Sequence, residues 1–445
     1  MLFGCQRSGE EHRERPHVLL ISFDTFRADA VDPFLTPALA RFAEDAIAFD
    51  KAFVPYPHTL TSHMTLLTGV YPDVHSVYPP GGSLSPSIST LDSLLQAAGY
   101  RTVGVVTTEW LKPKFGFARG FDHYEILPHK ATYAERVNRR ALAQLPASAS
   151  EGPPTFLFLH YYDPHSDSEQ GGTNELPYYS PASYRRHLEL AEGEFRDELG
   201  RCCTRYLIEA DKARVALAQD HVDKIFELYK SGIRALDDEM GAFFDELRHR
   251  GLYDDALIVI TSDHGEEFRE HGRFIHSQPY DETVSVPLLI KLPGSRMAGQ
   301  AVASPVESLD LLPTLLDYLG IDRPGYLEGR DLLAFASRPT ASERGLIAQD
   351  SIAFHRYSLR AGRFKLLTNL KHGGLELYDL QADPSERTNL AASRPDLARQ
   401  LRQELVARLE ASRELGRQLE TEAAATDDLL TPEEKESLEA LGYLN

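Results

Sequence analysis

Two acidic residues stand directly after apolar runs that have the composition of buried strands. Asp24 follows residues 18–23, and Asp263, with His264 beside it, follows residues 257–262. Residues at the carboxyl ends of strands in an open α/β sheet meet in one crevice. A buried carboxylate is costly unless it is paired or bound to a cation. Two aspartates and a histidine that converge therefore predict a divalent-metal site with Asp24, Asp263 and His264 as ligands. The alternative for either aspartate alone is a cap on the segment that follows it.

A segment rich in hydroxyl groups, residues 57–69, supplies the second part of the predicted site. It reads as a loop that leads into a short helix ending at Gly69, with Thr59 just before the helix start. A hydroxyl at that point would face the metal, with backbone N–H groups aimed at the same place. This arrangement cradles an anion while a nucleophile is activated. The alternative for Thr59 is an ordinary helix cap, with Ser62 as the rival cap residue.

Regular elements must position these residues. The long amphipathic stretch at residues 222–250 predicts a helix that Gly251 stops. Strands that alternate with helices predict an α/β fold, with a large mixed, mostly parallel sheet sandwiched by helices. Polar, Gly-containing stretches at residues 147–154 and 166–179 predict loops. The runs rich in Leu, Ile and Val that predict buried strands are residues 18–23, 103–106, 156–159, 257–260 and 286–290.

A shift in composition near residues 330–344 predicts a domain boundary. Residues 16–330 are expected to form the main domain, which would carry the metal site. Residues 331–445 are expected to form a small C-terminal α+β subdomain. Its antiparallel strands are predicted at residues 357–367 and 375–380, and its charged tail is predicted to be helical. Residues 1–15 are expected to be a disordered tail.

Charge and length narrow the classes of partner. The chain has 445 residues, of which 42% are hydrophobic, and a formal net charge of -20. The hydrophobic content suffices for one large core and a smaller unit. So acidic a surface repels nucleic acid backbones, and nucleic acid is not expected as a partner. Any site for an anion must carry its own local positive charge. No apolar run is long enough to span a membrane.

The cysteines bear on the compartment. The sequence Leu-Phe-Gly-Cys at residues 2–5 resembles the lipobox of bacterial lipoproteins, although no basic or apolar region precedes it. Lipidation at Cys5 would make the protein periplasmic or lipid-anchored, whereas a chance cysteine in a tail would leave it cytoplasmic. Cys202 and Cys203 are adjacent, and adjacent cysteines rarely bridge each other, so no disulfide framework is predicted.

Six segments resemble motifs of the sulfatase family, in the order of that family and over nearly the whole chain. They correspond to the first metal strand, the nucleophile stretch, a central His-bearing strand, the second metal motif, a late helix and the C-terminal domain. The resemblance implies an alkaline phosphatase-like fold, a sulfatase-like catalytic domain at residues 16–330 and hydrolysis of sulfate or phosphate esters. The segments are HVLLISFDTFRAD from His17, TLTSHMTLLTGVYPDVHSV from Thr59, FLFLHYYDPH from Phe156, GLYDDALIVITSDHGEEFREHGRFIHSQPYDETVSVPLLI from Gly251, ESLDLLPTLLDYLGI from Glu307 and ELYDLQADPSERTNLA from Glu376.

The chain departs from the family pattern at the nucleophile. Thr59 stands where the family has a Cys or Ser that is converted to formylglycine, and threonine cannot be converted. The Pro and Arg of that motif are replaced by Thr61 and His63, and the second Asp of the first metal strand is replaced by Thr25. A Lys and a His of the family are expected to be missing around residues 107–110.

The predicted ligands together with Thr59 are similar to a different branch of the superfamily. They match the one-metal, threonine-nucleophile pattern of lipoteichoic acid synthases and phosphoethanolamine transferases. They also match half of the two-metal site of nucleotide pyrophosphatase/phosphodiesterases. A second metal would need Asp163, His165 and His276, whose spacing fits that pattern poorly. One divalent metal ion is therefore expected, with Ca²⁺ or Mn²⁺ ahead of Zn²⁺.

The resemblance implies a mechanism. The metal would lower the pKa of the Thr59 hydroxyl, which attacks the substrate and forms a covalent ester. His63, His165 and His276 would contact the other oxygens of the anion, and His165 or His276 would protonate the leaving oxygen.

The identity of the nucleophile bears on the substrate. A sulfated threonine lacks the aldehyde exit that formylglycine has, so the chemistry favours phosphate or phosphonate esters, whereas the family favours sulfate. The expected partner is a small anionic ester, such as a sulfated or phosphorylated saccharide or lipid head group. The alternatives are a phospho-group transferase and a catalytically inactive, sulfatase-like binding protein.

Overall fold

The computed structural model describes residues 15–128, 134–148, 151–166, 176–191, 193–196, 202–212, 215, 217–337, 344–351 and 355–420. Cys5, most of the predicted N-terminal tail and the end of the predicted C-terminal subdomain lie outside these residues. The lipid-anchor hypothesis therefore stays a prediction. None of the helices in the described part of the chain has the length and apolar composition needed to cross a membrane.

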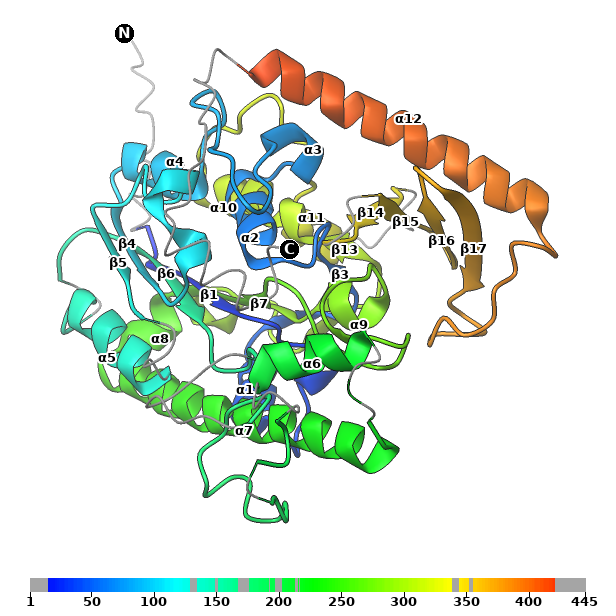
Figure 1. Ribbon diagram of the computed structural model, residues 1–445. Helices are drawn as coiled ribbons and strands as arrows, with labels where there is room; N and C mark the ends of the chain where they lie inside the picture. The colour runs from blue at the N-terminus through cyan, green and yellow to red at the C-terminus, as the bar shows by residue number, and fades with distance from the viewer. Residues whose placement is uncertain are drawn as a thin grey trace, which may run out of the picture.

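An eight-stranded sheet lies at the centre of the molecule (Figure 1). Five neighbouring strands (β7, β1, β6, β4 and β5) run parallel, and β11 runs antiparallel between β7 and β2. This confirms the predicted mixed, mostly parallel sheet. In spatial order the strands are β12 (Gln300–Val302), β2 (Ile47–Phe49), β11 (Leu288–Lys291), β7 (Leu257–Ser262), β1 (Val18–Phe23), β6 (Thr155–Tyr161), β4 (Arg101–Val106) and β5 (His123–Ile126).

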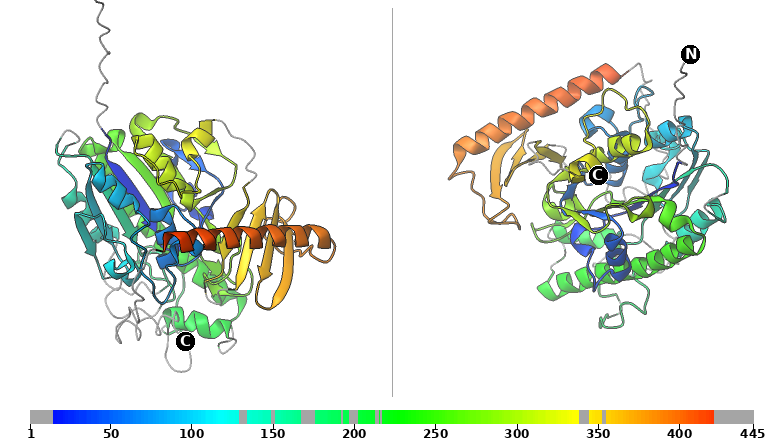
Figure 2. Two further views of the ribbon diagram at one scale, coloured as in Figure 1. Left: turned by 90° about the horizontal axis from the view of Figure 1, so that it is seen from above. Right: turned by 180° about the vertical axis from the view of Figure 1, so that it is seen from behind.

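Helices cover both faces of this sheet because its central strands are apolar on both sides. In β1, Leu19 and Ile21 point into one core, and Val18 and Leu20 point into the other. Figures 1 and 2 show the long α7 along one face and the group around α2 and α10 along the other. The first layer holds α1 (Pro37–Glu44), α5 (Ala134–Gln144), α7 (Gln219–His249) and α8 (Leu252–Asp255), and the second holds α2 (Thr59–Thr68), α3 (Pro72–His75), α4 (Leu91–Ala97), α10 (Leu311–Leu319) and α11 (Leu332–Ser337).

Local sequence signals set the ends of several elements. Helix α7 ends where predicted, because Gly251 takes the left-handed conformation with φ of 69°. The single strand predicted at residues 286–290 is wrong. Pro287, which has no N–H to donate to a ladder, separates β10 (Ser285–Val286) from β11. Strand β10 joins a small sheet with β3 (Ala52–Phe53) and β13 (Val306–Glu307).

A four-stranded antiparallel sheet forms the C-terminal part. The predicted run at residues 357–367 is a hairpin that turns at Gly362, where φ is 58°. Helix α12 (Pro395–Leu419) lies across this sheet and continues on to α3 of the main body, as Figures 1 and 2 show. The strands are β14 (Leu346–Gln349), β15 (Arg356–Ala361), β16 (Phe364–Asn369) and β17 (Gly373–Asp379).

One prediction about the cysteines is wrong. Cys202 and Cys203 form a disulfide bond although they are neighbours. Cys203 is the first residue of α6 (Cys203–Asp211) and takes a positive φ of 61°. The disulfide therefore lies at the start of a helix, and α6 itself packs against β9 (Phe274–Ile275).

Candidate active site

Asp24, Asp263 and His264 lie together at the carboxyl ends of the neighbouring strands β1 and β7. The parallel register pairs Phe23 with Ser262, so the two aspartates follow at the same level. His264 Nε2 lies 3.7 Å from Asp24 Oδ1 and 3.5 Å from Asp263 Oδ2, and all three side chains are fully buried. The structure thus brings the three predicted ligands within reach of one ion.

Backbone groups hold the second aspartate in place. The N–H groups of Thr25 and His264 donate to Asp263 Oδ1 over 3.2 and 2.8 Å. Thr25 adopts a positive φ of 53°, which turns the chain directly after Asp24. One oxygen of Asp263 is therefore held by the backbone, while the other faces His264.

The donor set fits a divalent cation. Among the residues that the structure describes, no hydrogen-bond partner reaches Asp24 Oδ1, Asp263 Oδ2 or His264 Nε2. In the same described part of the chain, only histidines form ion pairs with the two carboxylates. Unpartnered buried carboxylates are costly, and two carboxylates with one imidazole are ligands that a divalent metal accepts.

The pKa shifts of the two aspartates go in opposite directions. Burial raises the pKa of Asp263 well above its usual range, and the neighbouring Asp24 carboxylate adds to the effect. Burial acts in the same sense on Asp24, but His165, His160 and His264 hold the pKa of Asp24 well below its usual range. Two neighbouring carboxyl groups that are buried in this way can both be ionised only when a cation lies beside them.

Thr59 is the first residue of α2 and faces Asp24. Its Oγ1 donates a hydrogen bond to Asp24 Oδ2 over 3.3 Å. The preceding His58 is the N-cap, and its Nδ1 accepts from Leu60 N, so the cap uses one of the backbone groups predicted to cradle an anion. Ser62 lies inside the helix and donates to the carbonyl of Asp263 over 2.5 Å, which fastens α2 to the end of β7.

His63 is placed differently from the prediction that it contacts the anion. One ring nitrogen, Nδ1, lies 2.8 Å from the carbonyl of Thr59, and the other, Nε2, lies 2.9 Å from Ser22 Oγ. Burial lowers the pKa of His63 to about 3, and nearby His160 adds to this. A neutral imidazole with both nitrogens engaged supports the backbone of Thr59 and brings no positive charge to a substrate.

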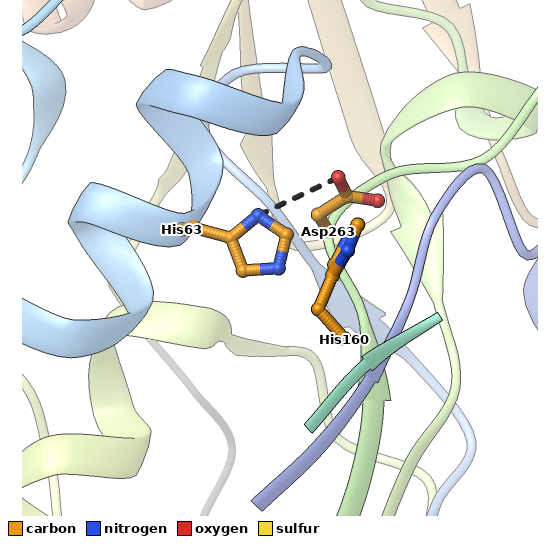
Figure 3. A group of neighbouring side chains, drawn as sticks. All are labelled: His63, His160 and Asp263. Carbon is orange, nitrogen blue, oxygen red and sulfur yellow. Dashed lines mark ion pairs between the residues drawn. The ribbon is translucent and has the colours of Figure 1, made fainter. Parts of the chain in front are cut away.

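Figure 3 shows His63, His160 and Asp263 close together, and Asp263 also belongs to the group of predicted metal ligands. His63 Nδ1 lies 3.6 Å from Asp263 Oδ2. Because both nitrogens of His63 already have partners, this group is a poor second metal site. Asp163, another candidate for a second metal, accepts a hydrogen bond from Ala134 N at the start of α5 and belongs to no metal-like group of the described residues.

Sequence reasoning missed His160, which belongs to the site. Its Nδ1 lies 3.0 Å from Thr107 Oγ1, and its Nε2 lies 3.3 Å from Asp24 Oδ2. Its position on β6, the strand next to β1, was the available signal, because both strands end at the same edge. Trp110, from the same stretch as Thr107, packs its ring 4.8 Å from that of His58.

His165 and His276 lie next to each other beside this cluster, and both are buried. Their ring centroids are 5.6 Å apart, and the His276 ring lies 4.1 Å from that of His264. Glu266, which the sequence analysis did not select, is buried and places Oε1 3.2 Å from His276 Nδ1. Burial raises the pKa of Glu266 to about 8, against the opposing effect of His165. Its place two residues after His264 was the signal for it.

Comparisons with known proteins show the family and the fold of this chain. Residues 16–321 match the sulfatase family, and residues 269–414 match the C-terminal region of N-sulphoglucosamine sulphohydrolase. The chain is 23% identical to an N-acetylglucosamine-6-O-sulfatase of Bacteroides thetaiotaomicron, over 87% of this chain and 85% of that protein. It is 26% identical to the multifunctional alkaline phosphatase superfamily protein PehA of Trinickia caryophylli, over 74% of this chain and 78% of that protein.

Solved structures show the same fold. A phosphonate monoester hydrolase from Silicibacter pomeroyi superposes with a TM-score of 0.70 at 22% identity, covering 89% of this chain and 96% of the other. A structure described as BT4656 in complex with D-glucosamine-2-N,6-O-disulfate gives a TM-score of 0.70 at 18% identity, covering 93% of this chain and 100% of the other. The chain therefore belongs to the sulfatase family, the ester hydrolases with the alkaline phosphatase-like fold.

Proposed function

We propose that this protein hydrolyses singly charged sulfate, phosphonate or phosphate esters with Thr59 as the nucleophile. The observation that carries the proposal is the position of the Thr59 hydroxyl. It stands at the start of α2, 3.3 Å from Asp24 Oδ2 and beside the three predicted metal ligands. A buried hydroxyl that donates to a carboxylate at the edge of a cation site is placed to become a nucleophile.

Asp24, Asp263 and His264 would hold a divalent metal ion. When bound, the ion supplies positive charge that favours the deprotonated hydroxyl and stabilises the developing charge on the anion. The unpartnered oxygens and nitrogen of these three residues support this assignment. A site with two carboxylates and one imidazole is compatible with Ca²⁺, Mn²⁺ and Zn²⁺.

The chain's own residues account for the exchange of bonds. The hydrogen bond to Asp24 Oδ2 orients the Thr59 hydroxyl, whose proton passes to solvent as the oxygen attacks. Thr59 Oγ1 forms a bond to phosphorus or sulfur as the bond to the leaving alcohol breaks, and the alcohol oxygen takes up a proton. Water then attacks the same atom, releases the anion and returns Thr59 to its hydroxyl form.

His276 is the favoured source of the proton for the leaving oxygen. Glu266 Oε1 lies 3.2 Å from His276 Nδ1 and orients the imidazole ring beside the site. His165, 5.6 Å from His276 between ring centroids, would contact another oxygen of the anion.

The charge of the site supports a singly charged substrate. Two carboxylates would offset the two charges of the metal, and His63 has both nitrogens bound to neutral groups. In the described residues neither carboxylate has a lysine or arginine as an ion-pair partner. A sulfate ester or a phosphonate or phosphodiester brings one negative charge, whereas a phosphate monoester brings two near neutral pH and would be bound less well.

The experiment is a panel of p-nitrophenyl sulfate, phosphate, phenylphosphonate and a phosphodiester. Wild type and Thr59→Ala would each be stripped of metal and re-supplied with Ca²⁺, Mn²⁺ or Zn²⁺. We expect cleavage of a singly charged ester in wild type and its loss in Thr59→Ala. Cleavage that survives Thr59→Ala would remove the covalent mechanism. No cleavage with any metal would favour an anion-binding protein.

A further inference from the structure

Helix α6 is connected to the segment that carries His165. Near its N-terminus, Thr204 Oγ1 lies 2.8 Å from Ser166 Oγ, and both residues are buried. Ser166 directly follows His165, whose ring stacks on Tyr162 with centroids 4.4 Å apart. Since a buried hydroxyl pair gains a hydrogen bond that water cannot replace, this contact fixes the chain just after His165.

The other end of α6 is connected to the segment that carries His276. Both carboxylate oxygens of Asp211, the last residue of α6, lie 3.0 Å from the backbone N–H of Phe274, which donates to them. Phe274 stands two residues before His276, in strand β9. Arg269 lies 3.8 Å from the same carboxylate and balances its charge.

His165 and His276 come from parts of the chain that no continuous element joins. His165 follows β6, and His276 follows the short strand pair of β8 (Glu267–Phe268) and β9. Their rings nevertheless lie 5.6 Å apart beside the Thr59 site. Catalysis depends on holding such groups to within a fraction of an ångström, and two loops do not supply that without support.

We propose that α6 is a positioning element that sets the distance between His165 and His276, with Thr204 and Asp211 as its contact residues. The inference deepens the proposed function and rests on it. Asp211 and Thr204 touch no substrate in this scheme and act through the two histidines.

The test is a double-mutant cycle on the metal-loaded full chain with the ester cleaved best. Asp211→Ala is expected to lower kcat about tenfold with little change in KM, since it loosens the segment that carries His276. Asp211→Asn, whose side-chain oxygen can still accept from Phe274 N, is expected to recover most of the loss. In a His276→Ala background, Asp211→Ala should cost almost nothing more, because its effect passes through His276. The same cycle with Thr204→Val and His165→Ala tests the contact at the N-terminal end of α6.

A matched control separates positioning from general stability. Asp237 also accepts two backbone N–H groups, those of Ala38 and Leu39, each over 2.8 Å, but it joins α7 to α1. Asp237→Ala should lower the unfolding midpoint as Asp211→Ala does and leave kcat near the wild-type value. Equal loss of kcat in Asp237→Ala and Asp211→Ala would overturn the proposal, as would an Asp211→Ala effect that is unchanged without His276.

A second readout separates this inference from the proposed function. Tungstate, a tetrahedral oxyanion, is titrated into the metal-loaded variants by calorimetry. If wild type hydrolyses no ester but binds tungstate, the proposed function fails. The positioning role then stands if Asp211→Ala weakens tungstate about tenfold only when His276 is present. A wild type that neither hydrolyses nor binds tungstate would overturn both.

Discussion

Two buried clusters of charged residues in this protein are built in opposite ways. At the joint between the main body and the C-terminal sheet, Lys365 lies 2.7 Å from Asp281 and 2.8 Å from Glu386, and Arg360 also pairs with Asp281. Burial would raise the pKa of Asp281, but Lys365 and Arg360 hold it well below its usual range. Each charge in this joint cluster therefore has a partner of opposite sign within the chain.

The cluster at the ends of β1 and β7 lacks such partners. Asp24 and Asp263 are fully buried, whereas the side chain of Asp281 is 27% exposed. Histidines are nevertheless the only described residues that form ion pairs with Asp24 and Asp263, and Asp24 Oδ1 and Asp263 Oδ2 accept no hydrogen bond from the described residues. Burying charges without partners costs stability, so a chain keeps them where a ligand completes them. The difference fits a structural role for the joint cluster and the proposed metal-binding role for the strand-end cluster.

The largest expected effect tests whether the strand-end cluster carries chemistry. Thr59→Ala should lower kcat by about a thousandfold or more, because the attacking oxygen is lost. Thr59→Ser keeps the hydroxyl and should retain measurable turnover. Steady-state kinetics on the ester panel gives both values. Equal loss in the two variants would point to a packing role for Thr59 in place of a nucleophilic one.

The next effect is on stability and belongs to the joint cluster. Asp281→Asn should lower the free energy of unfolding by about 3 kcal/mol, because it deprives Lys365 and Arg360, which are themselves buried, of a negative partner. Urea denaturation in the presence of chelator measures this. Metal affinity should stay at the wild-type value. A loss below about 1 kcal/mol would show that the joint cluster is solvated enough to do without the charge.

Metal removal should lower the free energy of unfolding through the strand-end cluster alone, with no contribution from the joint cluster. With free metal at a hundred times its dissociation constant, the bound ion is expected to add about 2.7 kcal/mol to the free energy of unfolding. Thermal unfolding with and without chelator shows the difference, and Asp281→Asn should show the same metal-dependent shift as wild type. Wild type that unfolds at one temperature under both conditions would contradict the metal assignment.

The smallest effect is a gain in the free energy of unfolding at the strand-end cluster, opposite in sign to the loss expected for Asp281→Asn in the joint cluster. Without metal, Asp263→Asn should raise the free energy of unfolding by about 1 kcal/mol, because it relieves the repulsion with Asp24 while its amide oxygen still accepts from Thr25 N. The same variant should lose the stabilisation by metal. Urea denaturation in chelator and in excess metal measures both. Destabilisation of the metal-free Asp263→Asn protein would mean that the two carboxylates are not in conflict.

Prediction from sequence succeeded where local patterns are strong. The apolar runs of β1 and β7, each followed by an aspartate, placed two ligands at one edge of the sheet, and the register of the two strands bears this out. Gly69 and Gly251 ended their helices as expected. The boundary near residue 330 and the roles of Thr59, His165 and His276 stay predictions.

Side-chain roles that depend on residues far away in the sequence could not be predicted from the sequence. His63 has the same spacing from Thr59 as the Arg of the family motif has from its nucleophile position, but Ser22, from another part of the chain, lies 2.9 Å from one of its nitrogens. Glu266 and His160 were not selected from the sequence, because their places in the site depend on His276 and Asp24 lying next to them. A side-chain hydrogen bond depends on which groups the fold brings together, and the distance between two residues in the sequence does not tell whether they meet.

The sequence by itself determined the fold class and the family and nominated the residues of a candidate cation and anion site, because strand periodicity, strand-end carboxylates and motif order are local properties. Only the tertiary structure decided which buried groups are satisfied within the chain and which remain for a ligand. That division depends on contacts between β1, β6, β7 and α2. The hydrogen bond from Ser262 Oγ on β7 to the carbonyl of Phe23 on β1, for example, joins residues 239 positions apart. Packing in three dimensions sets those contacts, and with them the difference between the joint cluster and the strand-end cluster.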